Sequence, residues 1–178
     1  MKNVHIKNIV LSAMFLAIGI VLPFLTGQIQ HIGNMLLPMH IPVLLCGLIC
    51  GWKYGFLVGF IMPLLRSGLF SMPVMYPGAI AMAFELGTYA LVVGILYEKY
   101  HWHCLKALYK SLVAAMVAGR IVWGMAMSLL LGMGAFTFKM FFAGAFVTAI
   151  PGIILQLILI PVIMVKLGKA KVIKWRNK

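Results

Sequence analysis

Long apolar runs separated by short polar interruptions dominate this chain. The runs occupy residues 8–25, 38–51, 55–69, 79–97, 112–131 and 140–165. A helix needs about 20 apolar residues to cross the hydrocarbon core of a bilayer. Gly51 and Gly55 interrupt a stretch that is too long for one helix, so a tight hairpin of two short spans is expected there. The pattern predicts an all-α integral membrane protein with six transmembrane helices in one domain, residues 1–178.

The interruptions differ in character. Residues 27–38, GQIQHIGNMLLP, are polar but contain no Lys or Arg, and residues 70–77 form a loop rich in Met, Pro and Tyr. Residues 98–110, EKYHWHCLKALYK, are amphipathic and predicted to be in water, and residues 132–139 form a short Gly-rich turn. In the last run, Pro151 and Pro161 are expected to bend the helix.

Composition agrees with a membrane protein. Hydrophobic residues make up 64% of the chain and charged residues 10%, whereas soluble domains are about half apolar and a quarter charged. The net charge is +13, which in a soluble protein would suggest a nucleic-acid partner. Here the basic residues lie at helix ends and in the C-terminal tail, so no nucleic-acid partner is expected.

The distribution of Lys and Arg predicts the orientation. With both termini inside, the inner segments hold 12 of the 15 basic residues: Lys2, Lys7, Lys53, Lys99, Lys106, Lys110, Lys166, Lys169, Lys171, Lys174, Arg176 and Lys178. Of the others, only Lys139 belongs to an outer loop. Because cytoplasmic loops carry an excess of Lys and Arg, we predict a multi-pass protein of the cell membrane with both termini in the cytoplasm.

No catalytic set or cofactor site is found in the sequence. There is no P-loop, no H-E-x-x-H, no G-x-S-x-G and no Asp at all. His101, His103 and Cys104 lack the carboxylates and the helical spacing of a metal site. We therefore expect a protein that is not an enzyme and has no cofactor and no metal.

Three charged residues lie within apolar runs: Arg66, Glu85 and Arg120. A charge in hydrocarbon is costly, so it usually faces a cavity, a partner or a ligand. They could form a structural Arg–Glu pair, or bind a solute, with one surplus cation that suits an anion. Tyr89 and Trp123 lie on the same helical faces as Glu85 and Arg120 and could form an aromatic wall, although aromatic residues are common in bilayer helices.

Small residues four apart allow helices to approach closely in lipid. Such pairs are Ala13/Ala17, Gly47/Gly51, Gly55/Gly59 and Ala115/Gly119. Most are expected to pack within the chain. Ala13 and Ala17 lie in the first helix, where an external partner could also reach them.

Taken together, these residues resemble the substrate-binding S components of energy-coupling factor (ECF) vitamin transporters. The resemblance covers essentially the whole chain. Its motifs are Ala13-Met-Phe-Leu-Ala17 in the first span and LPMHIPVLLCGLICGWKYGFLVGF, residues 37–60, which is similar to the family's second–third helix hairpin. The nickel/cobalt branch of the family uses an N-terminal Met-His, whereas Lys2 follows Met1 here, which argues against a metal substrate.

The resemblance implies a solute-capture subunit that works with a membrane coupling protein and two cytoplasmic ATPases. Ala13 and Ala17 would dock on the membrane partner. The ligand site would lie toward the outer face, between the first outer loop, the loop after the third span and the last three helices. The residues expected there are Asn34, Arg66, Met75, Tyr76, Glu85, Tyr89, Arg120 and Trp123.

The sequence leaves the solute open. The surplus arginine favours a carboxylate such as pantothenate, whereas Glu85 equally suits a ring with amino donors. A small structural or assembly membrane protein without a solute ligand is the alternative from a different class.

Overall fold

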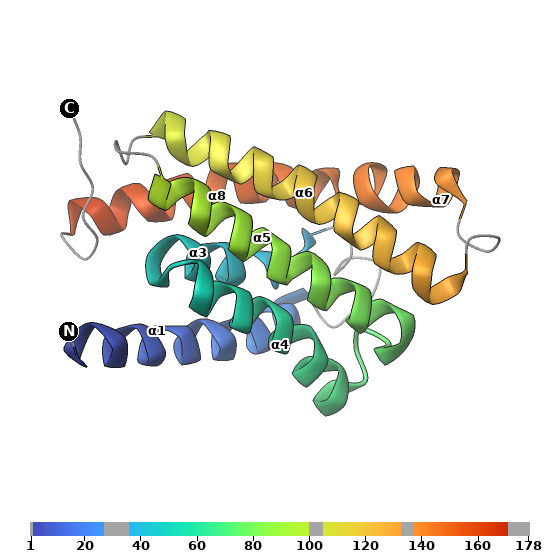
Figure 1. Cartoon of the computed structure of the whole chain (residues 1–178), viewed down its shortest axis with the longest axis horizontal. Helices are drawn as coiled ribbons and strands as arrows, with labels where there is room; N and C mark the ends of the chain where they lie inside the picture. The colour runs from blue at the N-terminus through green and yellow to red at the C-terminus, as the bar shows by residue number, and fades with distance from the viewer. Residues whose placement is uncertain (1, 27–35, 100–104, 133–136, 171–178) are drawn as a thin grey trace.

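A computed structural model describes residues 2–26, 36–99, 105–132 and 137–170, and all regular elements in these ranges are helices. Figure 1 shows them as a bundle of roughly aligned helices. In chain order they are α1 (Lys2–Val21), the 3-10 helix η1 (Leu22–Thr26), α3 (His40–Cys50), α4 (Trp52–Phe70), the π-helix η2 (Met75–Ala79), α5 (Ile80–Lys99), α6 (Leu105–Leu131), α7 (Phe138–Phe142), the π-helix η3 (Ala143–Val147) and α8 (Ile150–Lys169).

Four helical segments are long and apolar enough to cross a membrane: Val4–Phe24, Met75–Lys99, Leu105–Leu131 and Ile150–Lys169. They confirm the prediction of an all-α protein with several apolar helices. The α3 helix has 11 residues, or about 16 Å at 1.5 Å per residue, which is shorter than the hydrocarbon core. Such a helix can lie at membrane depth because protein surrounds it.

The α3 helix lies at the centre of the core. All of its residues except Ile49 are buried, and it packs against α1, α4, α5 and α8. A side chain added at Gly55 in place of hydrogen would have its Cβ 2.6 Å from the Cα of Gly47. The Gly47/Gly55 contact therefore brings α3 and α4 together within the chain, as the spacing of small residues predicted.

The predicted hairpin is present, but its turn is shorter than expected. Gly51 alone separates α3 from α4, with a φ of 92° that glycine adopts without strain. Gly55 does not interrupt the helix. It lies inside α4, where the lack of a side chain lets α3 pack closely against α4.

Two further boundaries differ from the prediction. The α6 helix begins at Leu105, so the second half of the stretch predicted to be in water is helical, and Ala107 and Leu108 are buried. The last apolar run is divided into α7, η3 and α8; Pro151 lies in the first turn of α8, which continues through Pro161. A proline suits a first helical turn because its missing N–H has no partner there in any case.

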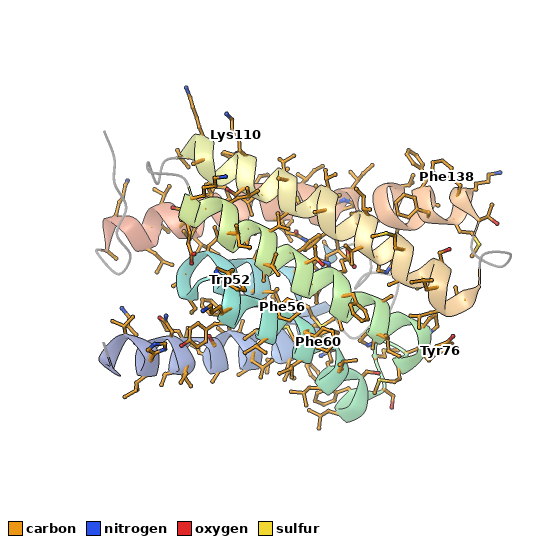
Figure 2. All side chains as sticks on the ribbon, in the orientation of Figure 1. Trp52, Phe56, Phe60, Tyr76, Lys110 and Phe138 are labelled. Atoms are coloured by element: carbon orange, nitrogen blue, oxygen red, sulfur yellow. The ribbon has the colours of Figure 1, made fainter. Side chains whose placement is uncertain are left out.

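The bundle has two distinct ends. One end, at the left of Figure 1, contains the start of α1, the α3–α4 turn, the end of α5, the start of α6 and the end of α8. The opposite end contains the α4–α5 connection, the end of α6 and α7. Figure 2 shows Lys110 at the first end and Tyr76 and Phe138 at the second.

Candidate functional site

A pocket of about 370 Å³ lies among the α4–α5 connection, α5, α6 and the η3–α8 region. Most of its lining is apolar, and its two charged side chains come from the first half of α5 and the middle of α6. The lining residues are Leu37, Pro73, Val74, Pro77, Gly78, Met82, Glu85, Arg120, Trp123, Met127, Gly144 and Thr148. An apolar pocket with a few convergent polar groups is the usual form of a small-molecule site.

Glu85 and Arg120 form a buried ion pair on the wall of this pocket. Nη1 of Arg120 lies 3.0 Å from Oε1 of Glu85, and both side chains are almost fully buried. His40, the first residue of α3, places Nε2 3.6 Å from the same oxygen. Three helices therefore bring three ionisable groups to one point. Within the described residues this cluster holds one cation and one anion in contact, plus an imidazole.

The pair depends on a close approach of α5 and α6. A Cβ at Gly119 would overlap the ring of Tyr89, so only glycine leaves room for that ring beside Arg120. Tyr89 is buried and packs edge-on against His40, with ring centroids 5.2 Å apart. Tyr89 thus packs against the ionic cluster and is not among the residues that line the pocket.

Arg66 is buried but lies apart from the pocket lining. Its Nη1 donates a hydrogen bond to the backbone oxygen of Ile20, at the end of α1. The guanidinium also lies 5.2 Å from the ring centroid of Phe24 and 5.6 Å from that of Phe70. Glu85 is paired with Arg120 and His40, and no contact between Arg66 and Glu85 occurs among the described residues. Arg66 joins the end of α1 to the end of α4.

Residues 71–79, the roof segment, cover the pocket. Pro73, Val74, Pro77 and Gly78 line it, whereas the side chains of Met75 and Tyr76 are exposed. The hydroxyl of Tyr76 donates a hydrogen bond to the backbone oxygen of Leu130, near the end of α6. The predicted loop therefore lies over the pocket, but Met75 and Tyr76 are on the exposed side of the loop and do not line the pocket.

Trp123, which lies on the same helical face as Arg120, lines the pocket wall. Its ring stacks near Phe141 of α7, with centroids 6.3 Å apart. A Cβ at Gly144 would be 3.1 Å from the Trp123 ring, so this glycine lets the ring lie close to η3. The aromatic side chain is therefore held between α6 and the segment that follows α7.

The remaining predicted residues lie elsewhere. Asn34, with the rest of the Gln28–Asn34 stretch, falls outside the described residues, as do His101, His103 and Cys104. Ala13 and Ala17 are exposed on α1, which contributes nothing to the described lining of the pocket.

His40 is the main residue that the sequence reasoning missed. A lone imidazole in an apolar segment, LPMHIP, was the signal that could have identified it, because an ionisable group at membrane depth is a candidate functional residue by default. Leu37, Gly144 and Thr148 carried no comparable signal, since no periodicity or charge distinguishes them. Within the described ranges, no three His, Cys, Asp or Glu side chains gather to form a metal site.

Chemically, the cluster can bind and orient but has no nucleophile beside a base. Its polar groups suit recognition of a small polar solute within apolar walls. In comparisons with known proteins, a family model described as "ECF transporter, substrate-specific component" matches residues 7–164. No curated protein and no solved structure matches the chain.

Proposed function

The chain belongs to the substrate-specific components of ECF transporters, and on that premise we propose that it captures a water-soluble vitamin or related cofactor precursor. Proteins of this family are transport subunits and not enzymes. They bind a solute and work with the ECF module, a membrane coupling protein with ATPases. For this chain we propose the vitamin class of the solute and the position of its binding site.

The observation that carries the proposal is the buried Glu85–Arg120 pair on the wall of the 370 Å³ pocket. Charges at this depth are retained where they serve a function. The solute would lie beneath the roof segment, with Trp123 and Met82 beside it and the ion pair at its polar end. Asn34 would complete the site from the first outer loop.

We propose that the basic end of the bundle faces the cytoplasm of a cell-membrane protein. Lys53, Lys99 and Lys110 lie in elements that meet at this end, and cytoplasmic segments are rich in such residues. The six-span arrangement with both termini inside follows from the same rule. The roof segment would then face the outside, where the solute enters.

Pantothenate is the specific candidate from the sequence. It was motivated by the surplus of two arginines, Arg66 and Arg120, over Glu85, and of these two Arg66 does not line the pocket. The carboxylate of pantothenate would therefore have to bind Arg120, whose Nε and Nη2 atoms have no hydrogen-bond partner within the described ranges. This observation keeps a carboxylate-bearing solute as the favoured class.

Ala13 and Ala17 are proposed as the contact with the membrane coupling protein. Both lie on an exposed stripe of α1 with Val10 and Val21. Small side chains allow another helix to approach closely in lipid, and this face is not used for packing within the described chain.

Mass spectrometry of small molecules released from the purified protein tests the proposal directly. A vitamin-class solute should be recovered, and adding it back at 100 times its dissociation constant should stabilise the fold by about 2.7 kcal/mol. The alternative, a structural or assembly protein without a solute, predicts no released solute and no stabilisation. Co-purification with ATPases of an ECF module distinguishes the two independently.

A further inference from the structure

Arg120 has one occupied and one free edge. Its Nη1 faces Glu85, whereas Nε and Nη2 are buried and have no hydrogen-bond partner among the described residues. Nε and Nη2 form the side-on edge of the guanidinium, whose two parallel donors match the two oxygens of a carboxylate. Since buried donors without a partner are costly, an acceptor pair from a solute in the adjoining pocket would satisfy them.

Glu85 is the residue that holds Arg120 in this orientation. Glu85 is 1% exposed, and its carboxylate contacts both Arg120 and His40 through Oε1. A group fixed by a buried partner loses little freedom when it binds a ligand, and this preorganisation favours affinity. Glu85 is thus a positioning residue for the arginine.

His40 completes the cluster beside Glu85, at the same carboxylate oxygen as Arg120. It is fully buried, and neither of its ring nitrogens has a hydrogen-bond partner in the described ranges. The charged groups that act on it are Glu85 of α5 and Arg120 of α6, and Tyr89 packs on its ring; the described parts of α1, α4 and α8, also packed against α3, contribute none.

The charges of this cluster do not balance once an anion binds. Glu85 and Arg120 cancel, so a carboxylate on the free edge of Arg120 leaves one negative charge in a buried site, which is costly. His40, 3.6 Å from Glu85, is the group placed to offset it. A protonated His40 would give alternating charges along the series His40, Glu85, Arg120 and solute carboxylate, with a sum of zero.

The start of α3 adds a second positive contribution. Leu37 lines the pocket, and α3 begins three residues later at His40. The amino-terminal end of a helix carries a partial positive charge that favours anions. Together with Arg120, which also lines the pocket, it favours a negative group there.

We infer that Glu85 holds Arg120 by one edge so that the other edge binds the carboxylate of the solute, and that His40 takes up a proton when the solute binds. This rests on the proposed function, because it concerns the solute captured in the same pocket. It assigns the anionic group of the solute to Arg120 and makes binding of the solute a proton-coupled event.

Isothermal titration of the full-length protein in lipid nanodiscs tests both parts. The probes are three acids with their neutral partners: pantothenate and pantothenol, nicotinate and nicotinamide, biotin and biotinamide. At least one acid should bind about tenfold or more tighter than its neutral partner, as charge-assisted bidentate pairs are markedly stronger than neutral ones. Equal or tighter binding of the neutral partners, or binding of none of the acids, would overturn the inference.

The same titration in two buffers of different ionisation enthalpy counts protons. Near neutral pH, where an imidazole is mostly uncharged, binding of the acid should take up close to one proton per site. A count of zero for the wild-type protein would overturn the role of His40 without any variant. Substitution H40Q should abolish the uptake, whereas the control H5Q, at an exposed histidine of α1 bonded to Tyr54, should keep it.

Substitution R120K separates charge from geometry. Lysine keeps the positive charge but lacks the paired donors, so affinity for the acid should fall about tenfold or more while that for the neutral partner changes little. Failure of this inference and of the proposed function are distinguishable. A chain that co-purifies with the ECF ATPases and binds only neutral probes refutes the inference alone, whereas loss of both co-purification and solute binding refutes the function.

Discussion

Arg120 and Glu85 meet at 3.0 Å across the α5–α6 contact, with both side chains almost fully buried. Breaking a buried pair from one side leaves an uncompensated charge, which is far more costly than removing both charges together. The same two residues therefore contribute both to the packing of α5 against α6 and to the polar wall of the pocket.

A double-mutant cycle on this pair should be strongly non-additive. E85Q or R120Q alone should cost about 3–5 kcal/mol, because each leaves a buried charge without its partner. The E85Q/R120Q double variant should lose much less than the sum of the two. Thermal melting of the unliganded protein in detergent measures this, and additive losses would show that the pair is not coupled.

Gly119 should not tolerate a methyl group. In G119A the new Cβ would overlap the ring of Tyr89, and overpacking of this kind costs about 1–3 kcal/mol. Because Tyr89 packs on His40, solute affinity should fall as well. G68A is the matched control: Gly68 lies exposed in α4 with no atom within 4 Å of the new Cβ, so its melting temperature should stay equal or rise.

Arg66 should contribute to stability through the ends of α1 and α4. R66Q removes a partly buried hydrogen bond from a charged group, worth about 1.5–3 kcal/mol, and two cation–π contacts with Phe24 and Phe70. The melting temperature should fall. If R66Q lowered the affinity for the solute as much as R120K does, Arg66 would instead be a residue that binds the solute.

Tyr76 should control the exit of the solute. Y76F keeps the ring but removes the hydrogen bond from the roof segment to Leu130. Because this hydrogen bond joins the roof segment to α6, its removal should let the segment open more often. The dissociation rate of the solute should then rise severalfold, while association changes less. Stopped-flow measurement of release checks this, and an unchanged rate would mean that the hydrogen bond does not hold the roof.

Larger side chains at Ala13 and Ala17 should block assembly without affecting capture. A13L/A17L places bulk on an exposed face of α1 that lies outside the described pocket lining. The amount of ECF module that co-purifies should fall sharply, while solute affinity and the melting temperature stay close to wild type. I9L, at an exposed position on the same helix, is the control for hydrophobic change alone.

Much of the architecture follows from local patterns. Apolar runs of the length of a bilayer predict helices at membrane depth, and the pairs Gly47/Gly51 and Gly55/Gly59 predict a close approach of helices, because each signal lies within a short stretch of sequence. The helix boundaries were less predictable. The first turns of α6 contain Lys106 and Lys110, and a polar stretch that is helical cannot be distinguished from a loop by hydropathy alone.

The sequence by itself determined that this protein is a helical membrane protein and that Arg66, Glu85 and Arg120 carry costly charges. Only the tertiary structure decided which of them meet. Glu85 pairs with Arg120 because Gly119 lets α5 and α6 approach, and Arg66 turns to Ile20 because α4 ends beside α1. His40 joins the cluster because a short buried α3 begins at that depth. Which charged side chains pair depends on the distances between helices. Those distances cannot be predicted from the local sequence around residues that are far apart in the chain.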